Sequence, residues 1–287
     1  MEQKEVIDLL DAMEEKMLDK VTLGFSPEIL AILDDMDASN NEIEMLKPRI
    51  GNEIMMHIFN IANSAYYGSL RKGSIYTFYE VVTRLGMSHT KALIIILGLQ
   101  LLAREDKEIE VIFARSFASS VIGKVIAQQF GMREDAVKKV ELGGLFSEIG
   151  KMIMVLYKKL HAQEDVRIDK EFIDKYQVYL SERIIEKFAL PDYLKPMIFS
   201  EGLVVEANYL TMSGLTQLAI NCVAASFNKF HNHLVIEALP LPLGQDQVAT
   251  LDSIIEDQFN AVNLGKYLRI IKKRERILPK YESKKKK

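Results

Sequence analysis

Apolar residues recur at intervals of three or four positions along most of this chain. In residues 2–18 they fall at Val6, Leu9, Leu10, Met13 and Met17, which gives a helix one apolar face. The same spacing predicts helices over residues 29–33, 43–46, 52–62, 77–85, 89–102, 111–130, 133–151, 176–188, 193–199, 213–230 and 246–271. Strand pairs, hairpin dipeptides and fixed-period repeats do not emerge from the pattern. We therefore expect an all-α protein of about a dozen helices.

Polar residues and glycines mark where these helices begin and end. We expect Asn40 or Asn41 to cap the short helix that follows, and Ser88 to cap the long apolar helix of residues 89–102. Gly86 is placed to end the preceding helix in a left-handed conformation. The helix of residues 133–151 is expected to be interrupted at its glycines, Gly143, Gly144 and Gly150.

The charged stretch of residues 104–110 is the best internal boundary. It separates an N-terminal helical lobe (residues 1–105) from a second helical lobe (residues 106–214), and we expect the two lobes to pack together. Residues 215–287 then form a C-terminal helical extension with a basic tail. A chain of 287 residues, 48% of them apolar, can fill a substantial core.

The cysteine content and the apolar runs bear on the cellular compartment of the protein and on whether it spans a membrane. The single cysteine, Cys222, excludes an internal disulfide and a zinc site of several thiolates, and its apolar neighbours predict a buried thiol. The first twenty residues are heavily charged, unlike a signal sequence. The longest apolar run, residues 92–103, is shorter than the roughly 20 residues that span a bilayer, so it predicts a core helix. These features favour a cytoplasmic protein without a transmembrane segment.

Charge is distributed unevenly along the chain. The formal net charge is −3, yet residues 271–287 hold nine Lys or Arg and two Glu, a local charge of +7 that leaves −10 for residues 1–270. Such a basic tail is typical of a solvated chain end, and the alternatives are weak contact with anionic lipid or with nucleic acid. Tyr281 is the only aromatic residue among these charges, so we expect no specific nucleic-acid reader.

The five histidines are too scattered to suggest a catalytic triad. We expect His57, His89 and His161 to be partly exposed structural residues. His231 and His233 have a spacing that can place both rings on one side of a loop, but no third ligand accompanies them before Glu237. We expect a surface loop at that position, not a metal site.

Two short motifs carry a resemblance to a known family. The first is Ile-Ala-Asn-Ser-Ala-Tyr-Tyr-Gly over residues 61–68, where Asn63 and Ser64 follow the end of a predicted helix. The second is Leu85-Gly86, at the end of another. In these motifs the chain resembles the HDOD family, whose name stands for HD-related output domain. An Asp-Pro pair that the family carries upstream would fall on Gly51-Asn52, where this chain departs from the pattern.

A third segment, residues 144–151, resembles the metal-binding segment of HD phosphohydrolases. It reads Gly-Leu-Phe-Ser-Glu-Ile-Gly-Lys, whereas those relatives have Gly-Leu-Leu-His-Asp-Ile-Gly-Lys. The resemblance implies that the second lobe is a degenerate HD-type helical core, in which Gly144 and Gly150 are structural positions. Ser147 and Glu148 stand where the relatives' His and Asp bind metal.

The remaining ligand positions of the HD pattern are also changed. The resemblance places Arg115 and Gln177 at two histidine positions, and Ser200-Glu201 where some relatives have His-His. We hypothesise that the Arg115 guanidinium replaces the charge of the lost metal and holds Glu148. Ser147 lacks a base within reach and is expected to be a polar residue that packs between helices, not a nucleophile.

A pocket with one or two carboxylates and no imidazole lacks the donors that a transition metal needs. We therefore expect neither metal nor cofactor, and no catalysis. The resemblance implies a regulatory output module of bacterial signalling that acts by binding a protein partner. Two alternatives stay open: a metal-dependent phosphohydrolase with rearranged ligands, and a receptor for a nucleotide or small phosphate that uses Arg115, Lys151 and Gln177. The sequence names neither the partner nor the oligomeric state.

Overall fold

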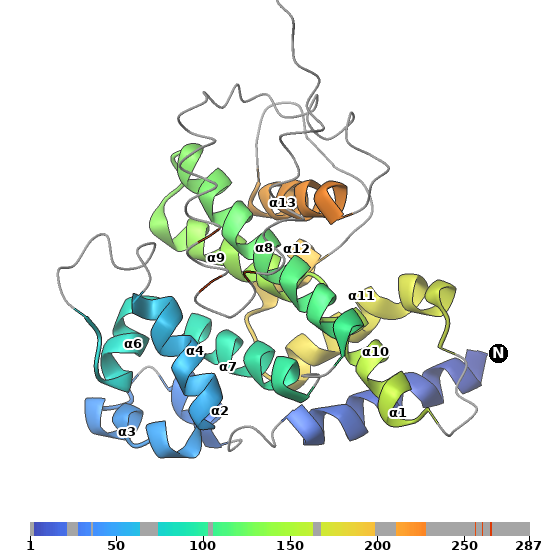
Figure 1. Cartoon of the computed structure of the whole chain (residues 1–287), viewed down its shortest axis with the longest axis horizontal. Helices are drawn as coiled ribbons and strands as arrows, with labels where there is room; N and C mark the ends of the chain where they lie inside the picture. The colour runs from blue at the N-terminus through green and yellow to red at the C-terminus, as the bar shows by residue number, and fades with distance from the viewer. Residues whose placement is uncertain are drawn as a thin grey trace, which may run out of the picture.

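A computed structural model of the chain describes residues 3–21, 28–35, 37–63, 74–102, 106–162, 168–198 and 211–227, with isolated positions at 256, 260 and 265. Every regular element within these ranges is a helix, and the all-α fold class is therefore confirmed. In Figure 1 the N-terminal helices form the lower part of the molecule and α8 runs up through its middle toward α13.

The N-terminal part is built around one apolar helix, α7. Six helical elements precede it: α1 (Gln3–Val21), α2 (Glu28–Asp34), α3 (Asn40–Glu44), η2 (Lys47–Arg49), α4 (Asn52–Asn63) and α6 (Phe78–Leu85). The helix α7 itself spans Met87–Leu102, and its residues from Thr90 to Leu99 are buried. It packs against α1, α2, α4 and α6 on one side and against α8 and α9 on the other. The uniformly apolar run thus becomes the centre of the core, because a helix without a polar face has to be covered on all sides.

The helix caps differ from those expected. Ser39, not Asn40 or Asn41, caps α3: its hydroxyl accepts from the backbone N–H of Glu42, and the Glu42 carboxylate accepts from the Ser39 N–H. This reciprocal capping box satisfies two otherwise unpaired donors, which a single Asn cannot do. The expected cap at Ser88 is also wrong, because α7 already begins at Met87.

Gly86 adopts the predicted positive φ angle, with φ 94° and ψ 152°. Its carbonyl accepts from the N–H of Thr90 at 3.0 Å and from the Thr90 hydroxyl at 2.8 Å. Gly86 thus ends α6, and its carbonyl accepts the first backbone hydrogen bond of α7.

The second part contains five helices of at least twelve residues and two short ones. They are α8 (Lys107–Gln129), α9 (Glu134–Phe146), α10 (Ile149–Leu160), α11 (Lys170–Lys187), η3 (Asp192–Leu194), α12 (Lys195–Ile198) and α13 (Met212–Phe227). The pair α8 and α9 makes extensive contact, and α13 packs against both. Asp169 caps α11 by accepting from the N–H of Phe172, so this helix begins six residues before the predicted start at Tyr176.

The predicted interruption at Gly143 and Gly144 does not occur, since α9 continues through both residues and ends at Phe146. The chain breaks instead at Ser147 and Glu148, and Gly150 lies in the first turn of α10. Close helix packing explains this outcome: a glycine weakens a helix by only about 1 kcal/mol, which neighbouring contacts readily offset.

The boundaries between the predicted parts are bridged by packing. The helix α1 lies against α10 and α11 as well as α7, and Arg183 of α11 pairs with Asp11 and Glu14 of α1. The helix α13 crosses the predicted boundary at residue 214 and packs against α8, α9 and α12. The division at residues 105 and 214 stays a prediction. The basic tail and most of residues 215–287 lie outside the described residues.

No single helix among the described residues is both long and apolar enough to cross a membrane. Helices α6 and α7 together have the length and the apolar composition of a membrane span, but the chain bends by 109° between them. Residues 89–99 of α7 are buried within the protein, as in a core helix.

Candidate functional site

The segment that resembles the HD motif forms the junction between α9 and α10. The Ser147 hydroxyl donates to the carbonyl of Gly144 at 2.8 Å, and the side chain is buried. Its proton is therefore directed into the last turn of α9 and not toward a base. This geometry is compatible with the expected packing role of Ser147. Glu148 is the second residue between the two helices.

Glu148 forms an ion pair with Arg115 of α8, as hypothesised from the sequence. Lys151, one turn into α10, approaches the same carboxylate oxygen, with Nζ 3.8 Å from Oε1. The side chain of Glu148 is 11% exposed, and those of Arg115 and Lys151 are each 21% exposed. Burial raises the pKa of the Glu148 carboxyl above its ordinary value, while Arg115 and Lys151 oppose this rise. Two cations thus surround one largely buried carboxylate.

Gln177 reaches this region through its backbone. The N–H of Gly150 donates to the Ser181 hydroxyl at 3.0 Å, and that hydroxyl donates to the Gln177 carbonyl at 2.8 Å. A Cβ atom added to Gly150 would lie 2.0 Å from the Gln177 carbonyl oxygen. The α10–α11 contact therefore needs glycine at position 150, as the motif implied, and Gln177 contributes its main chain to that contact.

Gly144 has a corresponding role between α8 and α9. A Cβ atom there would lie 2.5 Å from the backbone of Ser119 and Ser120. The backbones of the two helices can approach this closely only because Gly144 has no side chain. Along α8 this contact lies between Arg115, which pairs with Glu148, and Lys124, which pairs with Glu141. Two ion pairs and one close approach thus set the register of this antiparallel pair.

Asn63, the described half of the Asn-Ser motif, closes a loop. Its side-chain amide donates to the carbonyl of Ile75 at 3.2 Å, and its side-chain oxygen accepts from the Ile75 N–H at 2.7 Å. These bonds tie the end of α4 to the residues just before α6. Leu85 is buried beside the Gly86 turn. Ser64 lies outside the described residues, as do Ser200 and Glu201.

A family model described as the HDOD domain matches residues 25–198. This chain belongs to the HDOD family. The match covers the α9–α10 junction, Arg115, Gln177, and both N-terminal motifs, so the resemblance read from the motifs is confirmed.

Solved structures share the fold of this HDOD protein. A proposed metal-dependent phosphohydrolase from Shewanella amazonensis SB2B has a TM-score of 0.61 at 13% identity, over 91% of this chain and 98% of that one. An HDOD domain protein of unknown function from Geobacter sulfurreducens has a TM-score of 0.51 at 17% identity, over 88% of this chain and 97% of that one. At these identities the likeness concerns the fold alone. A search of curated proteins finds no match.

The side chains that the structure describes around Glu148 do not fit a metal ion. In the described ranges no three His, Cys, Asp or Glu side chains come together as a metal-binding group. Arg115 and Lys151 place positive charge where an ion would have to bind, and the Ser147 hydroxyl is engaged with Gly144. Among the side chains that the structure describes, a divalent ion at this position would face two cations and the Glu148 carboxylate.

Two of the histidine predictions are wrong in one respect. His57 and His89 are 3% and 4% exposed, not partly exposed, because they lie on the core-facing sides of α4 and α7. His161 is partly exposed, as expected, and its ring stacks on Tyr157 with centroids 4.3 Å apart. His231 and His233 lie outside the described residues, and so does the Cys222 side chain, although its backbone belongs to α13.

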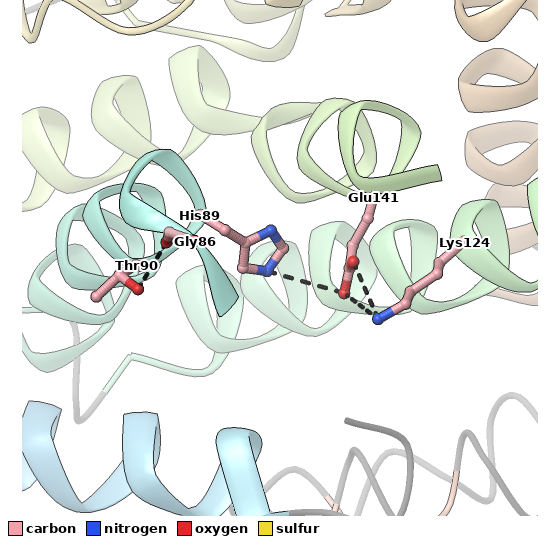
Figure 2. Close-up of polar contacts among 5 residues, drawn as sticks. All are labelled: Gly86, His89, Thr90, Lys124 and Glu141. Atoms are coloured by element: carbon pink, nitrogen blue, oxygen red, sulfur yellow. Dashed lines mark hydrogen bonds and ion pairs between the residues drawn. The ribbon is translucent and has the colours of Figure 1, made fainter. Parts of the chain in front are cut away.

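The sequence reasoning missed a buried set of charges. Lys124 and Glu141 lie on α8 and α9 and meet in the core, beside His89 (Figure 2). Each interrupts an apolar stretch of its helix, Lys124 between Ile122 and Val125 and Glu141 between Val140 and Leu142. Charged residues among positions that the helical period assigns to the core were the available signal.

Proposed function

We propose that this HDOD domain is a non-catalytic regulatory module that acts by binding a protein partner in a bacterial signalling pathway. The supporting observation is the ion pair between Arg115 and Glu148 at the position of the HD motif. The positive charge of Arg115 matches the negative charge of Glu148, so no bound metal ion is needed to balance the carboxylate.

The same contacts argue against a metal-free hydrolase. General-base catalysis needs an unengaged base within about 3 Å of its proton donor. Glu148 is engaged by Arg115 and Lys151, and Ser147 donates to a backbone carbonyl. Neither group is available for proton transfer in this arrangement.

Two alternatives have support of their own. The fold is shared with a proposed metal-dependent phosphohydrolase, which keeps that reaction class in view. Arg115 and Lys151 are both partly exposed, and among the described side chains they share the Glu148 carboxylate, which favours a receptor for a phosphate group. In a receptor, the phosphate would share Arg115 with Glu148 or displace it.

Metal content distinguishes the module from the hydrolase. The full chain is produced with manganese, iron and zinc supplied, purified without chelator or histidine tag, and analysed by plasma mass spectrometry. We expect far less than one metal per chain and no turnover of phosphomonoesters or phosphodiesters. One or two metals per chain that are lost in Glu148→Ala, together with turnover, would overturn the proposal.

Ligand and partner binding are tested separately. Thermal unfolding with added nucleotides or inorganic phosphate should show no shift; a stabilisation that Arg115→Ala abolishes would instead establish the receptor. For the partner, in-cell crosslinking of the full chain is followed by reconstitution from purified components. The proposal requires a stoichiometric complex that changes the partner's activity, and a complex without such a change contradicts it.

A further inference from the structure

The helix α1 lies across both parts of the molecule. It packs against α7 of the N-terminal part and against α10 and α11 of the second part, along the lower edge of the molecule in Figure 1. Within the described ranges α7 makes little direct contact with α10 or α11, so α1 bridges these three helices. We call the surface of α7, α10 and α11 that α1 covers the α1 seat.

One apolar stripe holds α1 to this seat. Val6, Leu10 and Met13 are spaced by four and three residues, which places them on one side of the helix, and they are 8%, 2% and 0% exposed. All three belong to the same apolar cluster as buried residues of α7, α10 and α11. Asp8 and Glu15 of α1 are exposed. A helix with apolar anchors at positions i, i+4 and i+7 is a recurring means by which one protein binds the surface of another.

Acidic and basic side chains meet at the edge of the α1 seat. Arg183 of α11 forms ion pairs with Asp11 and Glu14 of α1, and it donates to the Tyr179 hydroxyl at 3.4 Å. Tyr179 is 46% exposed, and the Arg183 side chain is 28% exposed. Tyrosine and arginine are enriched among the residues that contribute most to protein–protein binding. Here both lie at the edge of a surface that already holds an amphipathic helix.

The α1 seat is connected to the HD-type segment through α11. Arg183 follows Ser181 by two residues, and the Ser181 hydroxyl accepts from the Gly150 N–H at 3.0 Å. Gly150 in turn follows Glu148, which pairs with Arg115, by two residues. The residues that contact α1 and those that contact the HD-type segment thus share one turn of α11.

The helix and its seat belong to different portions of the chain. The family match over residues 25–198 includes all of α7, α10 and α11, whereas α1 precedes it. The HDOD domain therefore provides the seat, and a segment outside the match occupies it. A tethered ligand has an effective concentration of up to the order of millimolar, so α1 competes with any helix from another molecule.

We propose that the α1 seat binds an amphipathic helix of the protein partner, and that α1 is an internal competitor for the same surface. The inference rests on the proposed partner-binding function and specifies where the partner binds. The partner helix carries apolar side chains at positions i, i+4 and i+7 and carboxylates at i+5 and i+8. These carboxylates take the places of Asp11 and Glu14 beside Arg183. Exchange of α1 for the partner helix changes the contacts of Arg183 and thereby acts on the contact between α11 and Gly150.

Binding of a synthetic peptide to the full chain tests the seat. The probe is a fluorescein-labelled peptide of residues 1–21, and its binding is measured by fluorescence anisotropy. In the chain variant Asp11→Lys/Glu14→Lys, the tethered helix places two further cations beside Arg183 and competes less well. We expect this variant to bind one peptide per chain, at least about tenfold more tightly than the wild type does.

Two controls accompany this measurement. The chain variant Asp8→Lys/Glu15→Lys makes the same change of charge on the exposed side of α1 and should bind the peptide no better than the wild type. A second peptide keeps only the three apolar anchors and the two carboxylates of α1, with Ala, Gln or Lys elsewhere. It should bind the Asp11→Lys/Glu14→Lys chain within about tenfold of the natural peptide, because the seat recognises the pattern. Failure of either peptide to bind this chain in its folded state would overturn the proposal.

The partner itself is tested against the same peptide. A partner captured as described for the proposed function should displace the peptide from the Asp11→Lys/Glu14→Lys chain. A stable complex that leaves the peptide bound would overturn the α1 seat as the docking surface, while partner binding itself would stand. The absence of any regulatory complex in the reconstitution would instead contradict the proposed function.

A further measurement needs only the wild type and therefore applies even if the variant does not fold. Amide hydrogen exchange of the full chain reports whether α1 leaves its seat while the other helices stay folded. We expect the amides of residues 6–13 to share one opening constant, at least about tenfold larger than that of the α7 and α10 amides. Equal protection in α1 and α7 would mean that α1 leaves its seat only when the whole protein unfolds, and would overturn the proposal.

Discussion

Arg115 on α8 forms an ion pair with Glu148, which lies between α9 and α10 in the segment of residues 144–151 that resembles the HD motif. The two residues are 33 positions apart in the sequence and are brought together by the antiparallel packing of α8 and α9. The pair places a guanidinium of the chain itself beside the largely buried Glu148 carboxylate.

Replacement of Arg115 by Ala should destabilise the protein by about 2–3 kcal/mol. The change leaves Glu148 largely buried with Lys151 as its remaining counter-charge, and unpaired buried charges typically cost about 3–5 kcal/mol. A fifth of the Arg115 side chain reaches solvent, which reduces the figure. Urea unfolding measures the change. The control is Arg133→Ala, which breaks a surface pair with Asp135 and should cost less than about 0.5 kcal/mol.

Glu148 should make stability depend on pH in the acidic range. Because burial raises the pKa of its carboxyl in the folded state, the folded chain holds this proton more tightly than the unfolded chain. The proton's contribution to stability is complete below the ordinary pKa of a glutamate and is lost as the pH rises through the folded-state value. In Glu148→Gln this loss should be absent, so its stability relative to wild type should improve with pH. A difference that stays constant from pH 4.5 to 7.5 would contradict the shift.

Gly150→Ala should destabilise the protein by about 2–3 kcal/mol, because the added methyl group would lie 2.0 Å from the Gln177 carbonyl oxygen and 2.6 Å from the Ser181 hydroxyl. The helices α10 and α11 can accept it only by moving apart. Gly214→Ala on α13 is the matched control, since the atom nearest to its Cβ is the Thr211 hydroxyl at 3.3 Å. Thermal and urea unfolding of both variants should show a loss for Gly150→Ala alone.

Thr77→Ala should cost about 1 kcal/mol. Thr77 and Glu80 form a reciprocal capping box at the start of α6, and the alanine removes the hydroxyl that accepts from the Glu80 N–H. Thr83→Ala on the same helix removes an exposed hydroxyl that donates to the Tyr79 carbonyl, and should change stability by less than about 0.5 kcal/mol. Equal effects of the two substitutions in urea unfolding would refute the role of the cap.

Local sequence patterns were sufficient to predict most of the helices. The helical spacing of apolar residues predicted α1, α4, α6, α7, α8 and α13 with ends within a few residues, because each of these helices buries one side or all of its surface. The two motifs indicated the HDOD family, and their residues make local contacts that depend on residue type. Gly86 adopts a positive φ angle, and the Asn63 side chain forms hydrogen bonds with the backbone of Ile75. The frame of residues 144–151 likewise singled out Glu148, and the resemblance to the HD pattern at a separate position singled out Arg115.

Contacts between distant segments decided the rest. Helix α9 runs through Gly143 and Gly144 because the backbone of α8 packs closely against it there. A Cβ atom added at position 144 would lie 2.5 Å from that backbone. The burial of His89 and its meeting with Lys124 and Glu141 depend on three helices at once. Helical period assigns a residue to a face, but it does not say which charges from other helices meet that face. The sequence by itself therefore determined most of the helices and the family, and only tertiary packing determined which charges are buried together.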